Sequence, residues 1–261
     1  MARLEWSAVG ERFYEAGVDR GVLYVDDAGY PWNGLVSIDE NPTGGEEKAY
    51  YCDGVKYLNL ASREEFKATI NAFYSPRAFD ACDGVVSVRP GLFASQQRRK
   101  AFGLSYRSRI GNDLSGTNYG YKIHIVYNAL ATPAPRRYAT ESDDTSPSVL
   151  SWGITTKAVA IPDAMRSAHL IVDSTEAPAY VLSLLEDILY GNSLNPPRLP
   201  DPDEIAALFD DDTEFTVTDL GEGVFEISGS DMSVQMLSPG VYQITHDNVV
   251  ALDEGRAQIS S

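Results

Sequence analysis

Tyr121-Lys122-Ile123-His124-Ile125-Val126-Tyr127 is the stretch that decides the fold class of this 261-residue chain. Large apolar side chains occupy its odd positions, whereas Lys122 and His124 fall on the other face, because successive strand residues point to opposite faces of a sheet. Such alternation predicts a half-buried strand with one face in a core and one polar face.

Similar short runs fill the first 200 residues, separated by Gly, Pro, Asn and Asp. This pattern is typical of a mainly β domain. Cys52-Asp53-Gly54-Val55 favours a hairpin over residues 48–60, because Asp-Gly accepts the positive φ angles of a two-residue turn. Further strands are predicted at residues 21–25, 35–39, 65–74, 101–110, 148–157 and 168–172.

One amphipathic helix is predicted at about residues 176–190. Ser174 or Thr175 is its expected N-cap, Pro178 lies in its first turn, and Gly191 suits a left-handed C-cap. Its apolar residues recur at the spacing that lines one helical face. They are Val181, Leu182, Leu185, Ile188 and Leu189.

The chain changes character after this helix. Four prolines within residues 194–202 predict an extended strap, and a short helix is expected at residues 203–209. The acidic run at residues 210–212 indicates a linker, because adjacent like charges stay solvated. We therefore predict a β domain at residues 1–209 and a small all-β domain at residues 213–261.

The small domain contains an internal repeat. Gly-Val-Phe-Glu-Ile-Ser at residues 223–228 recurs as Gly-Val-Tyr-Gln-Ile-Thr at residues 240–245. Each copy precedes turn residues and a second apolar run, so two similar hairpins are predicted. Because about 45 residues make a marginal core, we expect this domain to lean on the main domain or on a neighbour.

Composition indicates a folded, acidic protein. The hydrophobic fraction is 43% and the net charge is −17, of which −13 lies after residue 200. Such a balance disfavours specific binding to nucleic acid or to an anionic membrane. No apolar run is long enough to span a bilayer, and the first residues lack a signal-peptide core, which predicts a soluble product made in the cytosol.

The sequence offers little catalytic chemistry. His124, His169 and His246 lie on separate predicted strands or turns without metal-ligand spacing, so each is expected to be an ordinary strand or turn residue. Nucleophile and phosphate-loop motifs do not occur. Glycosidases need a pair of carboxylates, but in a chain with 38 carboxylates such a pair is no evidence for this activity. We expect no enzyme activity, no cofactor and no metal site.

Three further features of the sequence each allow two interpretations. Cys52 and Cys82 are expected to be reduced thiols, with a disulfide as the alternative. The run at 210–212 is expected to be a solvated linker, with weak calcium binding as the alternative. The basic cluster Arg98, Arg99 and Lys100 either solvates a loop or binds an acidic partner, including another copy of this acidic chain.

Several segments resemble the major tail proteins, or tail tube proteins, of long-tailed bacteriophages of the siphovirus type. The similarity runs in order through residues 1–209, whereas the repeat after residue 212 departs from it. The similar segments are Leu4-Glu5-Trp6, residues 9–24, Trp32-Asn33-Gly34-Leu35, residues 96–103 with Tyr106-Arg107, residues 110–113, residues 120–124, Leu189-Tyr190-Gly191 and residues 199–204.

This resemblance implies a tail-tube-like β-sandwich or barrel with one flanking helix. It further implies a structural virion protein whose six copies close a ring, with rings stacking into a tube that conducts DNA without binding it specifically. Its partners would be itself and other tail proteins. Its location would be the phage tail, after synthesis in the host bacterial cytoplasm.

Function then lies in the contacts between copies. Trp6, Phe13 and Tyr14 suit an arm or edge that docks on a neighbour, with an ordinary core strand as the alternative. Together with the basic cluster they are the candidate interface residues. A competing class is an adhesin or carbohydrate-binding module of a phage tail, for which 15 Tyr and 3 Trp could supply stacking platforms.

Overall fold

The computed structural model describes residue 6, residues 8–136, 138, 140 and 147–210, and the backbone of six short strands between residues 216 and 259. The chain divides into two compact units, Met1–Ala206 and Ala207–Ser261. In the described part of the chain, no helix is both long and apolar enough to cross a membrane.

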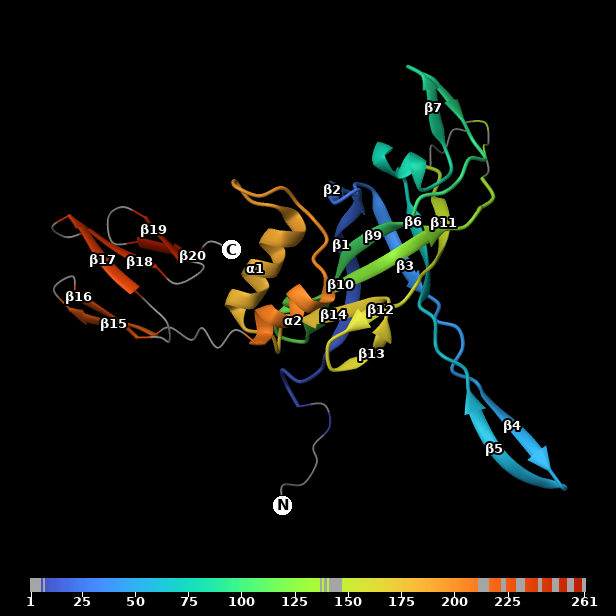
Figure 1. The fold of residues 1–261 in the computed structure, drawn as a ribbon, viewed down its shortest axis with the longest axis horizontal. Coiled ribbons are helices and arrows are strands. Elements are labelled where there is room, and N and C mark those ends of the chain that lie inside the picture. Colours follow the sequence, from blue (N-terminus) through green and yellow to red (C-terminus); the bar gives the residue numbers. More distant parts are fainter. Residues whose placement is uncertain are drawn as a thin grey trace. The chain divides into compact units, whose positions relative to one another are not determined.

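The first unit is built on one antiparallel sheet (Figure 1), so the prediction of a mainly β fold is confirmed. Its strands are β1 (Tyr14–Val25), β2 (Ala28–Pro31), β3 (Leu35–Glu40), β6 (Lys67–Ala72), β9 (Phe102–Asn112), β10 (Gly116–Ala131), β11 (Leu150–Thr155) and β14 (His169–Asp173). The strand order is β2-β1-β9-β10-β11-β6-β3, and β14 also pairs with β10.

Strand β10 joins the two halves of this sheet. Residues 122–126 pair with β14, whereas Leu130 and Ala131 pair with β11. Between them the register to β9 shifts, and Asn128 adopts a positive φ of 49°. Because an irregularity of this kind bends a strand, one strand can serve both halves and enclose a core.

The core is centred on aromatic rings. Trp152 and Phe79 are almost completely buried, and Phe79 lies in a 3-10 turn (Arg77–Ala81). Phe79 has ring centroids 4.8 Å from Trp32 and 5.4 Å from Trp152, while Phe102 lies 5.3 Å away. Tilted and edge-on aromatic pairs of this kind add stabilisation beyond the apolar area that they bury.

Helix α1 (Ala179–Tyr190) buries its predicted apolar face. It begins three residues later than predicted, because Pro178 is the N-cap and no side chain caps the helix. Ser174 Oγ accepts a hydrogen bond from the Tyr121 amide instead, at 2.8 Å. Gly191 has the predicted positive φ of 79°, but its ψ of 159° is extended rather than left-handed helical. The predicted second helix is α2 (Pro202–Asp210).

Residues 123–127 of β10 are buried on both faces, so the prediction of a polar face is wrong there. The strap after α1 covers one face, where the Tyr127 hydroxyl donates to the Pro200 carbonyl at 3.0 Å. On the other face Val126 joins the main core and His124 is only 6% exposed. Lys122 remains half-buried and forms an ion pair with Glu15. Alternation identified the strand, but the strap and the opposite sheet half bury both faces.

Three hairpins stand apart from the main sheet. They are β4 (Glu47–Cys52) with β5 (Val55–Ala61), β7 (Val86–Arg89) with β8 (Leu92–Ala94), and β12 (Val159–Ile161) with β13 (Ala164–Ser167). Figure 1 shows β4–β5 and β7–β8 projecting from the sheet. The predicted turn of β4–β5 is confirmed, since Asp53 and Gly54 have φ angles of 51° and 77°.

The second unit contains three hairpins rather than two. They are β15 (Thr216–Gly221) with β16 (Val224–Ser228), β17 (Ser233–Ser238) with β18 (Val241–Thr245), and β19 (Val249–Leu252) with β20 (Arg256–Ile259). The repeated strands β16 and β18 each close a hairpin with the preceding strand, so the prediction that they open one is wrong. Residues 211–215, which include most of the predicted linker, lie outside the described residues.

A buried hydroxyl ties the sheet to α1. Tyr24 Oη lies 2.9 Å from Ser105 Oγ and donates to the Leu189 carbonyl at 2.8 Å. We expect Tyr24→Phe to lower the free energy of unfolding by about 1–2 kcal/mol, because buried partners lose a hydrogen bond. Urea denaturation measures this change. Tyr51→Phe is the control, since Tyr51 is 70% exposed, and an equal effect of both variants would contradict the prediction.

Candidate assembly surfaces and a clustered histidine pair

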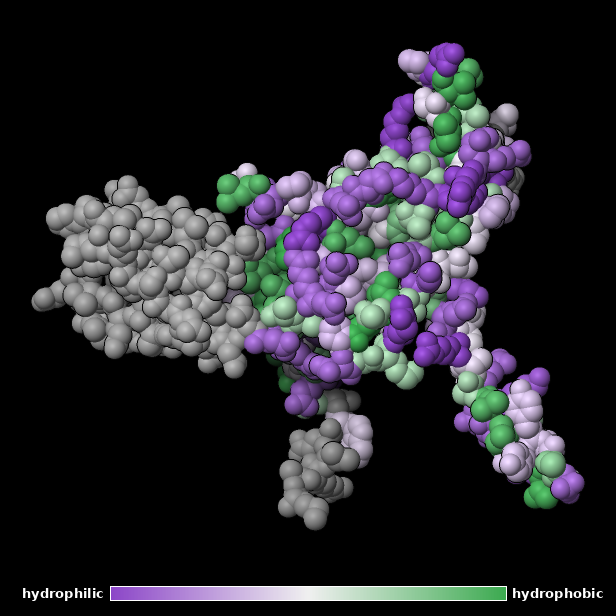
Figure 2. Space-filling model, in the orientation of Figure 1, coloured by the Kyte–Doolittle hydropathy of each residue, from purple (hydrophilic) through white to green (hydrophobic). Residues whose placement is uncertain are grey.

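The hairpin β4–β5, called the arm from here on, exposes an apolar face. Tyr50 pairs with Leu58, and Leu60 lies two residues further on the same face. These side chains are 44%, 38% and 56% exposed. Figure 2 shows hydrophobic residues along the projecting hairpin. The opposite face is mixed, because Asn59 donates to Glu47 at 2.8 Å while Tyr57, two residues before Asn59, is 74% exposed.

Contacts within the first unit add little to the stability of this arm. A two-stranded hairpin is at best marginally stable in water, and neither strand of the arm contains a buried residue. Contiguous exposed apolar surface marks a site of protein contact. The second projecting hairpin, β7–β8, exposes Val86, Val88, Leu92 and Phe93 in the same way.

The predicted aromatic residues lie near the N-terminus and are exposed, so the alternative of a core strand is wrong. Trp6, Phe13 and Tyr14 are 80%, 54% and 44% exposed. Phe13 packs on Tyr119, with ring centroids 4.9 Å apart. The preceding segment is fixed to the β9–β10 turn, because the Gly10 amide donates to Asp113 at 3.0 Å. A role for these residues at an interface remains a prediction.

The basic cluster is largely paired within the subunit. Arg99 forms an ion pair with Asp83 at 3.0 Å, and Lys100 forms one with Asp26. Arg98 is exposed. Two of the three cations thus form ion pairs within the subunit, and an interface role for the cluster remains a prediction.

A second basic group is neutralised on β9. Arg107 donates to both carboxylate oxygens of Asp19, at 2.7 Å and 3.0 Å, and Arg109 donates to the same carboxylate at 2.8 Å. Arg107 and Asp19 have side chains only 13% and 25% exposed. Bidentate pairing in a partly buried setting gives strong, specific hydrogen bonds.

We expect Asp19→Asn to lower the free energy of unfolding by about 1–3 kcal/mol at neutral pH, because hydrogen bonds to charged groups contribute this much. The hydrogen bonds from Arg107 and Arg109 lower the pKa of Asp19 from its ordinary value of 3.8. The stabilisation is therefore complete above pH ~4 and is lost as the pH falls through the lower folded pKa. Urea denaturation of the wild type and of Asp19→Asn should show that the difference between their free energies of unfolding shrinks below pH ~4. A difference that stays constant with pH would contradict a stabilisation by the charged Asp19 carboxylate.

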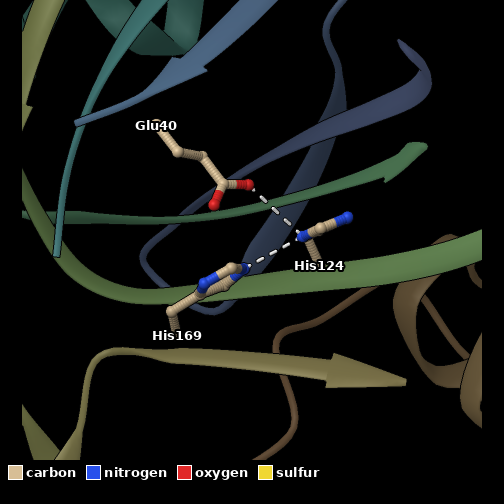
Figure 3. Close-up of side chains that lie close together, drawn as sticks. All are labelled: Glu40, His124 and His169. Atoms are coloured by element: carbon tan, nitrogen blue, oxygen red, sulfur yellow. Dashed lines mark hydrogen bonds and ion pairs between the residues drawn. The ribbon is translucent and has the colours of Figure 1, made fainter. Parts of the chain in front are cut away.

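Two histidines that are 45 residues apart in sequence lie side by side (Figure 3). His124 is on β10 and His169 starts β14, and the register pairs His169 with Val126. His124 Nδ1 lies 3.0 Å from His169 Nε2 and 3.5 Å from Glu40 Oε1. Both histidines lie on strands, as predicted, but strand pairing brings them together, which their spacing in the sequence did not indicate; His246 lies outside the described residues.

Neighbouring residues hold this cluster in place. Ser108 Oγ lies 3.0 Å from His124 Nε2, and the Tyr106 hydroxyl donates to Glu40 at 2.5 Å. The Tyr106 ring stacks on His124, with centroids 4.6 Å apart. Burial lowers the pKa of both imidazoles, although the Glu40 carboxylate opposes this shift. Both rings are therefore neutral at pH 7, with lone pairs able to accept a proton or a metal ion.

Both cysteines are free thiols. Cys52 is exposed at the end of β4, whereas Cys82 is buried beside the aromatic core. Burial raises the pKa of Cys82 to about 12. The expectation of reduced thiols agrees with this arrangement.

Fold and surfaces together define a mainly β protein with projecting hairpins. No protein-family model and no curated sequence matches the chain. Solved structures similar to it include a chain of the PVC sheath–tube complex of an extracellular contractile injection system in the extended state (14% identity, 65% of this chain, 94% of that chain, TM-score 0.30). Another is from the PVC sheath/tube terminator of such a system in the extended state (14% identity, 65% of this chain, 99% of that chain, TM-score 0.31).

A third similar structure is from the anti-feeding prophage cap, the AFP tube terminating cap (12% identity, 67% of this chain, 97% of that chain, TM-score 0.31). TM-scores of this size are too low to carry a conclusion about function. The functional assignment therefore rests on the chain's own residues and surfaces.

Proposed function

We propose that this chain is a non-enzymatic structural subunit of a phage tail, and that copies of it assemble into stacked hexameric rings that form a DNA-conducting tube. The observation that carries the proposal is the arm, whose apolar side chains Tyr50, Leu58 and Leu60 are exposed in the described part of the chain. Head-to-tail contacts between identical subunits continue into rings or filaments, so an arm that docks on the next copy produces such an assembly.

The charge distribution supports a tube through which DNA passes. Residues 1–200 carry a net charge of only −4, and much of their basic surface is paired with carboxylates. Each phosphate contact in a lumen would add attraction and slow passage. A nearly balanced charge over residues 1–200 suits conduction without binding.

Exposed surfaces also favour contact between copies over recognition of a carbohydrate. Carbohydrate-binding sites use aromatic platforms in a concave site. The aromatic residues of one concave region of the first unit, Tyr24, Phe102 and Tyr127, are buried below 5% exposure. The exposed aromatics among the described residues concentrate on projecting segments, as at Trp6, Tyr51 and Tyr57.

The acidic second unit belongs on the outside of the proposed tube, where added mass does not block the channel. In the virion the subunit would contact further copies and other tail proteins, after synthesis in the cytoplasm of the host bacterium. Because the second unit is a separate compact body, truncation after Phe209 is expected to leave assembly intact.

Negative-stain electron microscopy of concentrated full-length and truncated protein tests the proposal. Rings or tubes from both proteins are expected. Discrete monomers of the full-length chain that bind glycans on an array would instead identify a carbohydrate-binding module. Loss of rings only in the truncated chain would reject the outer placement of the second unit.

A further inference from the structure

We propose that Glu40, His124 and His169 form a binding site for one divalent transition-metal ion, with zinc as the best match. The ion would connect β3 in one half of the sheet to β10 and β14 in the other. Ligand atoms of all three residues lie within 4.8 Å of one another. This inference is independent of the proposed tail function.

Two of the three distances between the ligand atoms are close to those around a tetrahedral ion. A zinc ion with bonds of about 2.0–2.1 Å holds its ligand atoms about 3.3 Å apart. His124 Nδ1 lies 3.0 Å from His169 Nε2 and 3.5 Å from Glu40 Oε1, on either side of that value. Two imidazoles and one carboxylate form a donor set that first-row transition metals prefer over Mg²⁺ and Ca²⁺.

The surrounding residues resemble the outer shell of a metal site. Metal-binding histidines donate their second ring nitrogen to a nearby acceptor, which fixes the tautomer. Ser108 Oγ lies 3.0 Å from His124 Nε2 and can accept from it in the tautomer that leaves Nδ1 bare. Tyr106 orients the Glu40 carboxylate through its hydroxyl. Phe66 packs on the His169 ring at 4.4 Å.

An ion would replace the hydrogen bond between the two histidines. His124 Nδ1, His169 Nε2 and Glu40 Oε1 face one another, while the Tyr106 hydroxyl also donates to Glu40 Oε1. A dication satisfies all three lone pairs together. Neutral imidazoles are the form that coordinates metal.

The proposed ion can reach the site from solvent, and it would lie where the arm joins the sheet. The Glu40 side chain is 38% exposed, so an ion can enter from solvent and keep water as its fourth ligand. Glu40 ends β3, and the chain then passes through the Thr43–Glu65 bridge into the arm. An ion at this point would fix the root of the arm to the sheet.

Calorimetric titration of zinc into the untagged, EDTA-treated full-length protein tests this site. One zinc ion per chain is expected, together with a rise in Tm. Cobalt in place of zinc should give the visible absorption of a tetrahedral centre. His169→Gln and Glu40→Gln should each weaken zinc binding at least tenfold, whereas the control His246→Gln, which removes the chain's third histidine, should leave it unchanged.

Glu40→Gln keeps the test decisive if His169→Gln fails to fold, because the Glu40 side chain is partly exposed. The proposal is overturned if the wild-type protein binds no zinc at micromolar concentration. It is equally overturned if Glu40→Gln binds zinc as tightly as the wild type, or if only His246→Gln loses binding.

Discussion

A chain carrying Leu58→Thr and Leu60→Thr is expected to fold normally but to lose ring and tube formation. Both leucines lie on the apolar face of the arm and are 38% and 56% exposed. Burying a leucine against a partner contributes about 1.5–3 kcal/mol when it is complete. Partial burial of two leucines at every contact then weakens each contact by more than tenfold, and a repeating assembly multiplies the loss.

Sedimentation velocity over a concentration series measures this change, with circular dichroism to verify folding. Ala49→Thr with Asn59→Thr is the matched control, because these two residues pair with each other on the opposite face of the same hairpin. The control is expected to assemble as the wild type does. Equal assembly of both double variants would show that the apolar face makes no contact between copies.

Trp152→Ala is expected to lower the free energy of unfolding by about 3–5 kcal/mol, the cost of removing a large buried aromatic side chain. Trp152 is 1% exposed and packs edge-on against Phe79 and Trp32. Its loss leaves a cavity in the centre of the aromatic core, which β11 and β6 cannot close without breaking their pairing.

Urea denaturation followed by circular dichroism measures this loss. Trp6→Ala is the control, since Trp6 is 80% exposed and its replacement should change stability by less than about 0.5 kcal/mol. A loss below about 1 kcal/mol for Trp152→Ala would show that the core lies elsewhere.

Local patterns predicted much of the first unit because they depend on nearby residues. The Asp53-Gly54 pair predicts the hairpin of the arm, since positive φ angles at both positions specify a two-residue loop. The spacing of Val181, Leu185 and Leu189 identified α1. The predicted start of α1 is three residues too early. Ser174, an expected N-cap, accepts a hydrogen bond from the backbone amide of Tyr121 on β10 instead.

The histidine cluster could not be predicted, because it depends on register between distant segments. His169 meets His124 only because β14 pairs with β10, and Glu40 reaches them from the other half of the sheet. No spacing within the sequence encodes such a meeting. The one available signal was the alternation that placed His124 opposite Ile123 and Ile125, but it indicated solvent where the structure has an interior.

The repeat in the second unit shows a related limit. Residues 223–228 and 240–245 were recognised as equivalent, and β16 and β18 have equivalent registers. Which neighbour each repeat pairs with was not encoded in the repeat itself, because turn residues lie on both sides of it.

Whether the arm is covered by a second copy can be measured at Cys52, which is exposed beside the turn of the arm. The rate of Cys52 alkylation should be compared between dilute, disassembled protein and assembled protein, with buried Cys82 as the internal reference. We predict that assembly slows alkylation of Cys52 at least tenfold while Cys82 stays unreactive. Equal rates for Cys52 in both states would contradict the account, because the arm would then remain open to solvent in the assembly.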